Sequence, residues 1–211
     1  MDRFDQLVQN RRSIRKYKAA LPSEEMIRQM IACAAMAPSP SNSRPVRFVR
    51  IQSETMRHQL KQALEEGYQS FLERNREGQN DKRLRNRINV YKRYSDFIFS
   101  APILFAVGFV TGHTGFSKIL AEAGILEVDQ RESIDLDISV GLALQGFLLK
   151  AETLKIGTCI VSAPLVFIDN VEATLGLSDM RVRCLLTAGY PDEVPSHIER
   201  LDVDQMYRVI S

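Results

Sequence analysis

Four short apolar segments, separated by longer stretches with helical periodicity, constrain the fold of this chain most strongly. The clearest is 103–107, a run of apolar residues directly after Pro102, which has the length and composition of a buried strand. The other predicted strands are 46–51, 158–161 and 182–188. Because helical segments separate most of these strands, the pattern predicts an α+β or mixed α/β layer architecture. The length of 211 residues fits one domain, 1–211.

Amphipathic periodicity predicts the helices that cover this sheet. Their expected ranges are 2–10, 23–36, 54–73, 81–99, 134–154 and 168–175, with a short helix and a loop over 112–132. The helix over 134–154 is expected to carry Ile138, Leu142, Gln145, Leu148 and Leu149 on one side. These long helices have more apolar surface than one small sheet can cover. We therefore hypothesise that the chain dimerises through its helices.

Composition excludes several classes of protein. The chain is 45% hydrophobic and 26% charged, so it has enough apolar material to fold and is not mainly disordered. The longest apolar run, 101–110, contains Pro102 and Gly108 and is far shorter than the ~20 residues of a membrane helix. The amphipathic N-terminus has no apolar core of a secretory signal. We therefore expect a soluble cytoplasmic protein that has no membrane partner.

Cysteine and histidine usage agrees with this expectation. The three cysteines, Cys33, Cys159 and Cys184, are far apart in apolar sequence, which favours buried thiols in a reducing compartment over disulfides. The three histidines are dispersed, at positions 58, 113 and 197, and no Cys or His stands at the spacing of a zinc site. The sequence therefore predicts no metal site.

Charge is distributed unevenly along the chain. Residues 1–100 contain 20 Lys and Arg against 11 Asp and Glu, a net of +9, whereas 101–211 contain 8 against 15, a net of −7. Two stretches concentrate the positive charge, 11–16 and 74–93. The first half could therefore hold an anionic ligand.

The stretch Arg11-Arg12-Ser13-Ile14-Arg15 has two interpretations. Three guanidiniums and a hydroxyl within five residues could clamp a phosphate and leave one cation for a second anionic centre. The alternative is a solvated basic turn, which spacing alone favours. Other signatures are absent from the sequence: it has no GxGxxG after a strand, no P-loop and no nucleophile elbow.

The basic segment 83–93 also has more than one interpretation. It could bind a polyanion, with Tyr91 and Tyr94 available to stack on bases, which would make the protein an anion- or nucleic-acid-binding module. It could instead be a solvated outer face, or a helix that covers a ligand site. We favour the interpretation that this segment is a helix covering a ligand site over the interpretation that it binds nucleic acid.

Several motifs in order along the chain resemble the FMN-dependent nitroreductase family. They are Arg-Arg-Ser-x-Arg-x-Tyr from Arg11, Ala37-Pro38-Ser39-x-x-Asn42-x-x-Pro45, Ala101-Pro102 before an apolar strand, the small-residue helix at 141–149, Leu154-x-x-Gly157-Thr158-Cys159, and Ala188-Gly189-Tyr190-Pro191-x-Glu193. Each motif is weak alone, but their shared order is fairly specific.

This resemblance implies a nitroreductase-like α+β fold with a mixed central sheet flanked by helices. It implies a homodimer with FMN at the subunit interface and C-terminal segments that reach the partner chain. The implied activity is ping-pong transfer of hydride from NADH or NADPH to a small-molecule acceptor, such as a nitro compound or a quinone. A specialised flavin enzyme of the same fold, ring-fragmenting or dehydrogenating, is an alternative.

The resemblance also implies cofactor-binding residues near the N-terminus. Arg11 and Ser13 match residues that meet the FMN phosphate and ribityl chain, and Arg12 lies close by. Arg15 matches the basic residue that faces the pyrimidine edge of the flavin, where a cation stabilises the charge of the reduced ring. Arg200 matches a late phosphate-binding residue, although it could be a surface charge.

Two further pairs complete the implied flavin site, which needs no catalytic side chain. Ser39 and Asn42 match a loop that approaches the flavin from the second subunit, although they could be turn formers. Ser162 and Ala163 match a segment whose backbone N–H lies near flavin N5. One departure concerns Arg44-Pro45-Val46, where the family usually has Gln-Pro-Trp. This change favours an anionic acceptor, unless Arg44 simply points to solvent.

Overall fold

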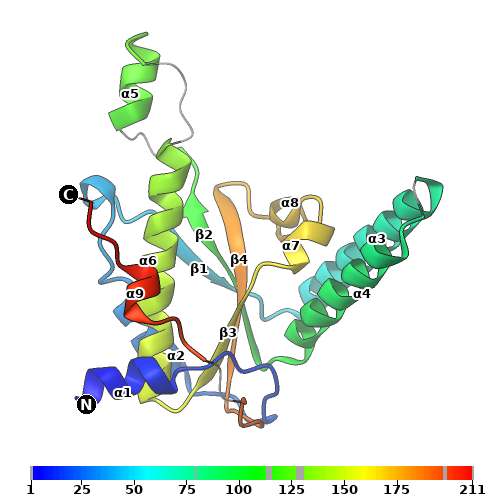
Figure 1. The fold of residues 1–211 in the computed structure, drawn as a ribbon, viewed down its shortest axis with the longest axis horizontal. Coiled ribbons are helices and arrows are strands. Elements are labelled where there is room, and N and C mark those ends of the chain that lie inside the picture. The colour runs from blue at the N-terminus through cyan, green and yellow to red at the C-terminus, as the bar shows by residue number, and fades with distance from the viewer. Residues whose placement is uncertain (1, 79, 113–115, 127–130, 197–198, 211) are drawn as a thin grey trace.

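A four-stranded sheet lies between a long helix on one side and a projecting helical hairpin on the other (Figure 1). The computed structural model describes residues 2–78, 80–112, 116–126, 131–196 and 199–210. The strands are β1 (Val46–Arg50), β2 (Ile103–Val110), β3 (Gly157–Val161) and β4 (Met180–Gly189). The helices are α1 (Arg3–Asn10), α2 (Glu24–Ala34), η1 (Pro40–Asn42), α3 (Glu54–Glu77), α4 (Lys82–Asp96), η2 (Phe97–Ser100), α5 (Phe116–Glu122), α6 (Arg131–Thr153), α7 (Pro164–Phe167), α8 (Val171–Leu175) and α9 (Val203–Met206).

The sheet has the order β1-β2-β4-β3, and all three pairings are antiparallel. All four predicted strands are present, which confirms the α+β class. The sheet of the described residues is antiparallel and not mixed as expected, and the parallel bridge between Ser13 and Thr158 is an isolated one. The β2–β4 register shifts between Val107 and Gly108, where a Cβ on Gly108 would lie 1.8 Å from the carbonyl oxygen of Arg181. Glycine is therefore required at this bulge.

Each face of the sheet has its own hydrophobic core. On one face, α2 and α6 cover the sheet, and the Phe147 ring stacks on Phe48 with ring centroids 5.4 Å apart. On the other face, Leu60 and Leu64 of α3 join Phe167 of α7 against the strands. Packing in the two cores fixes the position of β3 at both of its ends. This strand lies beside the candidate functional site.

Helix α6 carries apolar side chains on two sides. On the side named from the sequence, Ile138 is 55% exposed and Leu142 is 44% exposed, and Gln145 is exposed as well. The side chains that face the sheet and α2 are Leu136, Val140, Ala143, Leu144, Phe147, Leu148 and Ala151. Periodicity does not show which of two apolar sides meets the sheet.

Other elements differ in extent. The predicted helix over 168–175 corresponds to α8 alone, which begins at Val171 and which Asn170 caps through the N–H of Ala173 at 2.9 Å. Helix α7 precedes it over residues that were not predicted to be helical. The predicted helix over 81–99 ends at Asp96 and continues as the 3₁₀ turn η2. The tail, where no period is evident, contains α9. Residues 113–115 and 127–130, for which a helix and loop were predicted, lie outside the described residues.

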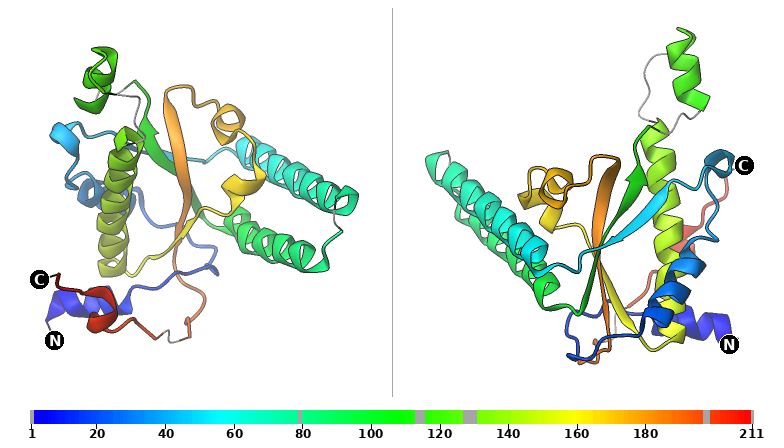
Figure 2. Two further views of the ribbon diagram at one scale, coloured as in Figure 1. Left: turned by 45° about the horizontal axis from the view of Figure 1, so that its top comes forward. Right: turned by 180° about the vertical axis from the view of Figure 1, so that it is seen from behind.

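Helices α3 and α4 form a hairpin whose far end projects away from the sheet in both views (Figure 2). The Asn75 side chain joins their ends, because its amide donates to the Asp81 carbonyl at 3.1 Å and its oxygen accepts from the Asp81 N–H at 3.2 Å. Lys92 of α4 pairs with Glu65 of α3 at 3.2 Å. The hairpin is attached to the body through Gly67, where a Cβ would lie 1.8 Å from the Phe167 carbonyl oxygen.

Substituting Gly67→Ala tests this attachment. Alanine normally stabilises a helix interior by about 1 kcal/mol relative to glycine. At Gly67 we expect the free energy of unfolding to fall by about 2 kcal/mol or more, because the methyl group collides with the backbone of α7. Urea unfolding measures this change. Lys61→Ala, at an exposed position of the same helix, is the control, and an unchanged or higher stability of Gly67→Ala would contradict the close contact.

Candidate functional site

The arginine-rich segment after α1 is attached to the edge of the sheet. Ser13 forms a parallel bridge with Thr158 of β3, and the Ile14 N–H donates to the Thr158 carbonyl at 2.9 Å. Ile14 is buried directly over Gly157, where an added Cβ would lie 2.7 Å from the Ile14 side chain. This contact explains the need for glycine at the start of β3, and it holds Ser13 at the sheet edge.

The other end of the segment is attached to the chain that follows β4. Tyr17 bridges Pro191, and the Lys18 N–H donates to the Tyr190 carbonyl at 2.9 Å. The Glu193 carboxylate accepts from the backbone N–H groups of Arg15, at 2.5 Å, and Lys16, at 3.0 Å. One side chain thus fixes the backbone at Arg15. Glu193 was predicted only as a residue of the Ala188-Gly189-Tyr190-Pro191-x-Glu193 motif, and its position two residues after Pro191 was the available signal.

A buried set of polar groups supports the same loop from beneath. The Tyr17 hydroxyl donates to the Ile14 carbonyl and lies 2.7 Å from the Thr187 hydroxyl, which donates to the Cys159 carbonyl at 3.3 Å. Burial raises the pKa of Tyr17, so its hydroxyl stays protonated as a donor. Burial also raises the pKa of the Cys159 thiol, against the opposing effects of the Arg15 charge and the Ser13 hydroxyl. None of the three cysteines is in a disulfide.

These attachments create a cavity of about 390 Å³ where the N-terminal loop meets the C-terminal segment. Its lining residues are Arg11, Arg12, Ser13, Arg15, Glu193, Val194, Pro195, Ser196 and Arg200. Arg12 is positioned by its guanidinium, which donates to the Ser196 carbonyl at 2.5 Å. The cavity thus brings together four predicted residues of the N-terminal cluster and Arg200, which is far away in sequence.

The cavity has a strong excess of positive charge. Burial and the neighbouring guanidiniums of Arg200 and Arg12 lower the pKa of Arg11. Among the residues that the structure describes, none of Arg11, Arg12, Arg15 and Arg200 forms an ion pair with a carboxylate. The Glu193 carboxylate is occupied by two backbone N–H groups. Guanidiniums beside a hydroxyl are the donor set that binds a phosphate ester most strongly, so the cavity suits such a group.

Ser39 and Asn42 do not line this cavity. The Ser39 hydroxyl accepts from the Arg44 N–H at 2.9 Å, and the Asn42 side-chain oxygen accepts from the Arg44 guanidinium at 3.3 Å. Ser41, Asn42 and Arg44 have φ values of 49°, 54° and 49°, in the left-handed region that non-glycine residues rarely adopt. The two residues therefore shape a strained loop, a feature that recurs at functional sites.

Ser162 and Ala163 lie in the turn between β3 and α7, also outside the cavity lining. The Ser162 carbonyl accepts from the Leu165 N–H at 3.0 Å, which starts α7. Their predicted position near flavin N5, like that of Ser39 and Asn42 at a second subunit, remains a prediction.

The nitroreductase family model matches residues 8–190. This chain belongs to the nitroreductase family. The structure and the family match together confirm the resemblance found in the sequence.

The chain is similar in sequence to proteins that are named for different activities. The chain is 24% identical over 200 residues to the putative NAD(P)H nitroreductase YfhC of Bacillus subtilis, covering 93% of this chain and 89% of YfhC. It is 26% identical over 202 residues to an iodotyrosine deiodinase of Thermotoga neapolitana, covering 95% of each. A stretch of 50 residues is 44% identical to 5,6-dimethylbenzimidazole synthase of Rhodospirillum rubrum, which covers 24% of this chain and 24% of that enzyme.

Solved structures share the fold. A BluB-like flavoprotein of Clostridium difficile has a TM-score of 0.83 at 20% identity, covering all of both chains. A putative nitroreductase of Desulfovibrio desulfuricans in complex with FMN has a TM-score of 0.68 at 18% identity, covering all of this chain and 98% of that one. At these identities the likeness concerns the fold alone.

The described residues contain neither a membrane-spanning helix nor a cluster of metal ligands. No helix there is both long and apolar enough to cross a membrane. No cluster of three or more His, Cys, Asp or Glu side chains that could hold a metal ion occurs in the same part of the chain. His113 and His197 lie outside the described residues.

Replacing Glu193 tests how the loop is held. In Glu193→Ala the N–H groups of Arg15 and Lys16 lose their acceptor, so we expect their hydrogen exchange to accelerate about tenfold or more. Glu193→Gln retains a side-chain oxygen and should show a smaller effect. Exchange measured by NMR gives the comparison, with exposed Asp192→Ala as the neighbouring control. Unaltered exchange at both amides in Glu193→Ala would contradict the proposed attachment.

Proposed function

We propose that this protein is an FMN-dependent oxidoreductase that transfers electrons from NADH or NADPH to a small-molecule acceptor, such as a nitro compound or a quinone, by a ping-pong mechanism. One observation carries the proposal: a cavity in which four guanidiniums and a hydroxyl converge without a carboxylate partner among the described residues. The family match and the FMN complex of a structural neighbour support FMN as the group that supplies the anion. The similarity to YfhC, which is named as a putative NAD(P)H nitroreductase, supports NADH or NADPH as the electron donor.

The donor set of the cavity fits a phosphate monoester. Arg11 and Ser13 hold the phosphate and ribityl chain in this proposal, and Arg12 and Arg200 contribute further positive charge. When bound, FMN supplies a ring that takes up hydride from a nicotinamide and passes electrons to an acceptor. Arg15 provides a fixed cation at the pyrimidine edge, and Glu193 holds the Arg15 backbone.

A homodimer completes the site in this proposal. Ile134, Ile138 and Leu142 lie exposed on one side of α6, at 53%, 55% and 44%, and a second subunit would bury them. The loop with Ser39 and Asn42 would then approach the cofactor of the other subunit, the turn with Ser162 and Ala163 would face the ring, and the C-terminal segments would reach across. The single domain 1–211 is therefore a flavin-binding unit of such a dimer, with a cytoplasmic location that its free cysteines support.

A second candidate is a specialised flavin enzyme of the same fold. The match to an iodotyrosine deiodinase over most of both chains, and the likeness to a BluB-like flavoprotein, favour keeping it. Arg44 is the residue that favours an anionic acceptor. It stands where the family usually has Gln, and Asn42 positions its guanidinium. Product analysis distinguishes this candidate from a nitroreductase.

The cofactor proposal is tested by comparing FMN with riboflavin, which lacks the phosphate. Arg11→Gln should weaken FMN binding by about tenfold to a hundredfold and leave riboflavin binding nearly unchanged, because the lost contact is to phosphate. Arg15→Gln should weaken both ligands to a similar degree. Flavin fluorescence titration gives the affinities, with exposed Arg28→Gln on α2 as the control. Equal loss for FMN and riboflavin in Arg11→Gln would contradict the assignment to phosphate.

The activity is tested on the FMN-loaded protein under anaerobic conditions. We expect NADH or NADPH to bleach the flavin absorbance, and a nitroaromatic compound or a quinone added afterwards to restore it. Stopped-flow absorbance follows both half-reactions. A protein that takes up no FMN, or whose bound flavin neither donor reduces, would contradict the proposed function.

A further inference from the structure

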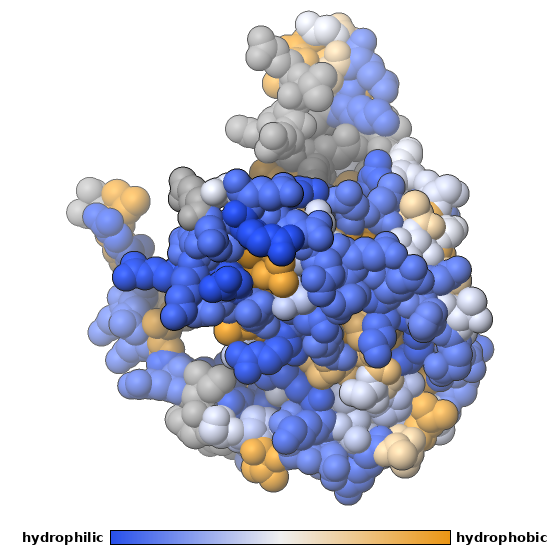
Figure 3. All heavy atoms as spheres, turned by 90° about the vertical axis from the view of Figure 1, so that its right-hand side faces the viewer, coloured by the Kyte–Doolittle hydropathy of each residue, from blue (hydrophilic) through white to orange (hydrophobic). Residues whose placement is uncertain are grey.

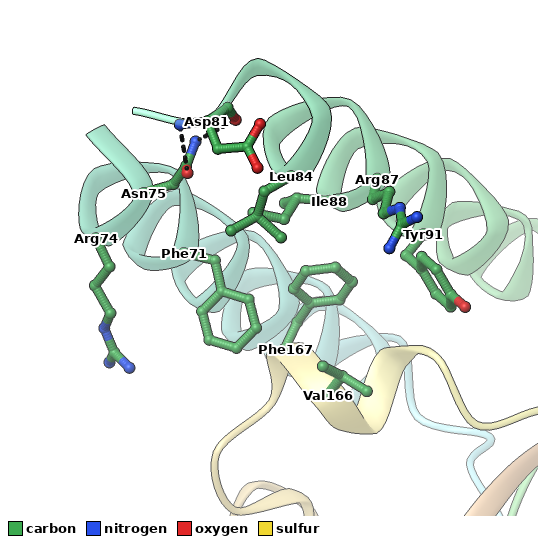
Figure 4. Close-up of a pocket in the computed structure, with 10 residues that line it drawn as sticks. All are labelled: Phe71, Arg74, Asn75, Asp81, Leu84, Arg87, Ile88, Tyr91, Val166 and Phe167. Carbon is green, nitrogen blue, oxygen red and sulfur yellow. Dashed lines mark hydrogen bonds between the residues drawn. The ribbon is translucent and has the colours of Figure 1, made fainter. Parts of the chain in front are cut away.

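A second cavity lies between the α3–α4 hairpin and α7, and it shares no lining residue with the guanidinium cavity. Its volume of about 710 Å³ is in the usual range of small-molecule sites. The apolar and aromatic side chains that line it are Phe71, Leu84, Ile88, Tyr91, Val166 and Phe167 (Figure 4). It is therefore an apolar cleft formed by three helices.

This cleft leaves apolar surface exposed on a part of the molecule that is otherwise charged. Leu84 is 46% exposed, Tyr91 56% and Val166 61%, whereas Phe167 is buried below them. The face of the molecule that carries the hairpin is mostly hydrophilic, with apolar residues scattered among the hydrophilic ones (Figure 3). An apolar surface gathered in a concave site and bordered by charges is typical of a ligand site.

The polar groups of the cleft indicate the charge of its ligand. Asn75 and the Asp81 backbone satisfy each other, and the Asp81 carboxylate caps α4 by accepting from the Arg83 N–H at 2.7 Å. Arg74 and Arg87 remain, on opposite sides of the apolar side chains (Figure 4).

Neither of these two guanidiniums is in an ion pair with a described residue. The Arg74 guanidinium lies 5.7 Å from the centre of the Phe71 ring. The cleft thus combines aromatic walls with two available cations, which complements a flat apolar anion.

We propose that this cleft binds an aromatic carboxylate of small-molecule size, with the ring among Phe71, Leu84 and Phe167 and the carboxylate at Arg87. Such a ligand would also contact Val166 of α7, a helix that directly follows Ser162 and Ala163. The basic hairpin would then serve small-molecule binding and not polyanion binding. The proposal does not require a bound flavin.

The test uses 2-naphthoate as the probe and the full chain saturated with FMN, with ¹³C-labelled methyl groups in Leu, Ile and Val. We expect saturable shifts of the methyl signals of Leu84, Ile88 and Val166. The uncharged analogue 2-naphthamide should bind about tenfold more weakly, since it lacks the charge-assisted contact. The same shifts should appear without added FMN, so a failure of the flavin proposal would not be mistaken for a failure of this one.

Matched variants distinguish binding in the cleft from a nonspecific effect of the positive charge of α4. Arg87→Gln should weaken 2-naphthoate by about tenfold. Arg85→Gln makes the same change at an exposed position of α4 outside the cleft lining, and it should leave the affinity unchanged. An equal loss in both variants would overturn the proposal, as would equal affinity for naphthoate and naphthamide or the absence of shifts at the three residues. Methyl shifts that follow protein concentration without the probe would show that a second copy covers the cleft, and would overturn it too.

Discussion

The attachment of the loop 11–17 to the start of β3 and to the segment after β4, which lie at the same end of this antiparallel pair, is the interaction on which the site depends. The bridge between Ser13 and Thr158 and the Glu193 carboxylate on the N–H groups of Arg15 and Lys16 join parts of the chain that are far apart in sequence. They hold several guanidiniums close together although these repel one another, and this repulsion contributes to the lowered pKa of Arg11. An anion in the cavity would relieve the repulsion, so the fold prepares a binding site at a cost in stability.

The sequence predicted the strands well because their positions depend on local composition. Each of the four is a short apolar segment bounded by helix or turn signals, and each is present. The buried side of α6 could not be predicted, because Ile138 and Leu142 are as apolar as Val140 and Leu144. Which side meets the sheet depends on contacts with α2 and the strands, and these are not local. The tail helix α9 has too few turns to give a periodic signal.

The candidate site was predicted in part, and the reasons differ between residues. Spacing alone favoured a solvated turn for the arginine cluster, and the resemblance to a family changed this interpretation. The structure then brings Arg200 to the same cavity, which no local pattern indicates. Ser39 and Ser162 do not line the cavity of one chain, and their places beside a flavin remain predictions. Sequence relatives of this chain have names that denote different activities, so family membership does not identify the acceptor, and local features such as Arg44 must be considered.

The central claim is that guanidinium groups hold the phosphate of FMN, and ³¹P NMR of the loaded protein tests it most directly. A free phosphate monoester loses its second proton near pH 6, and close guanidiniums favour the resulting dianion and lower this pKa. The account predicts that the ³¹P shift of bound FMN stays constant between about pH 5 and pH 8. A shift that titrates near pH 6, as in free FMN, would show that the phosphate lies in solvent and would contradict the account.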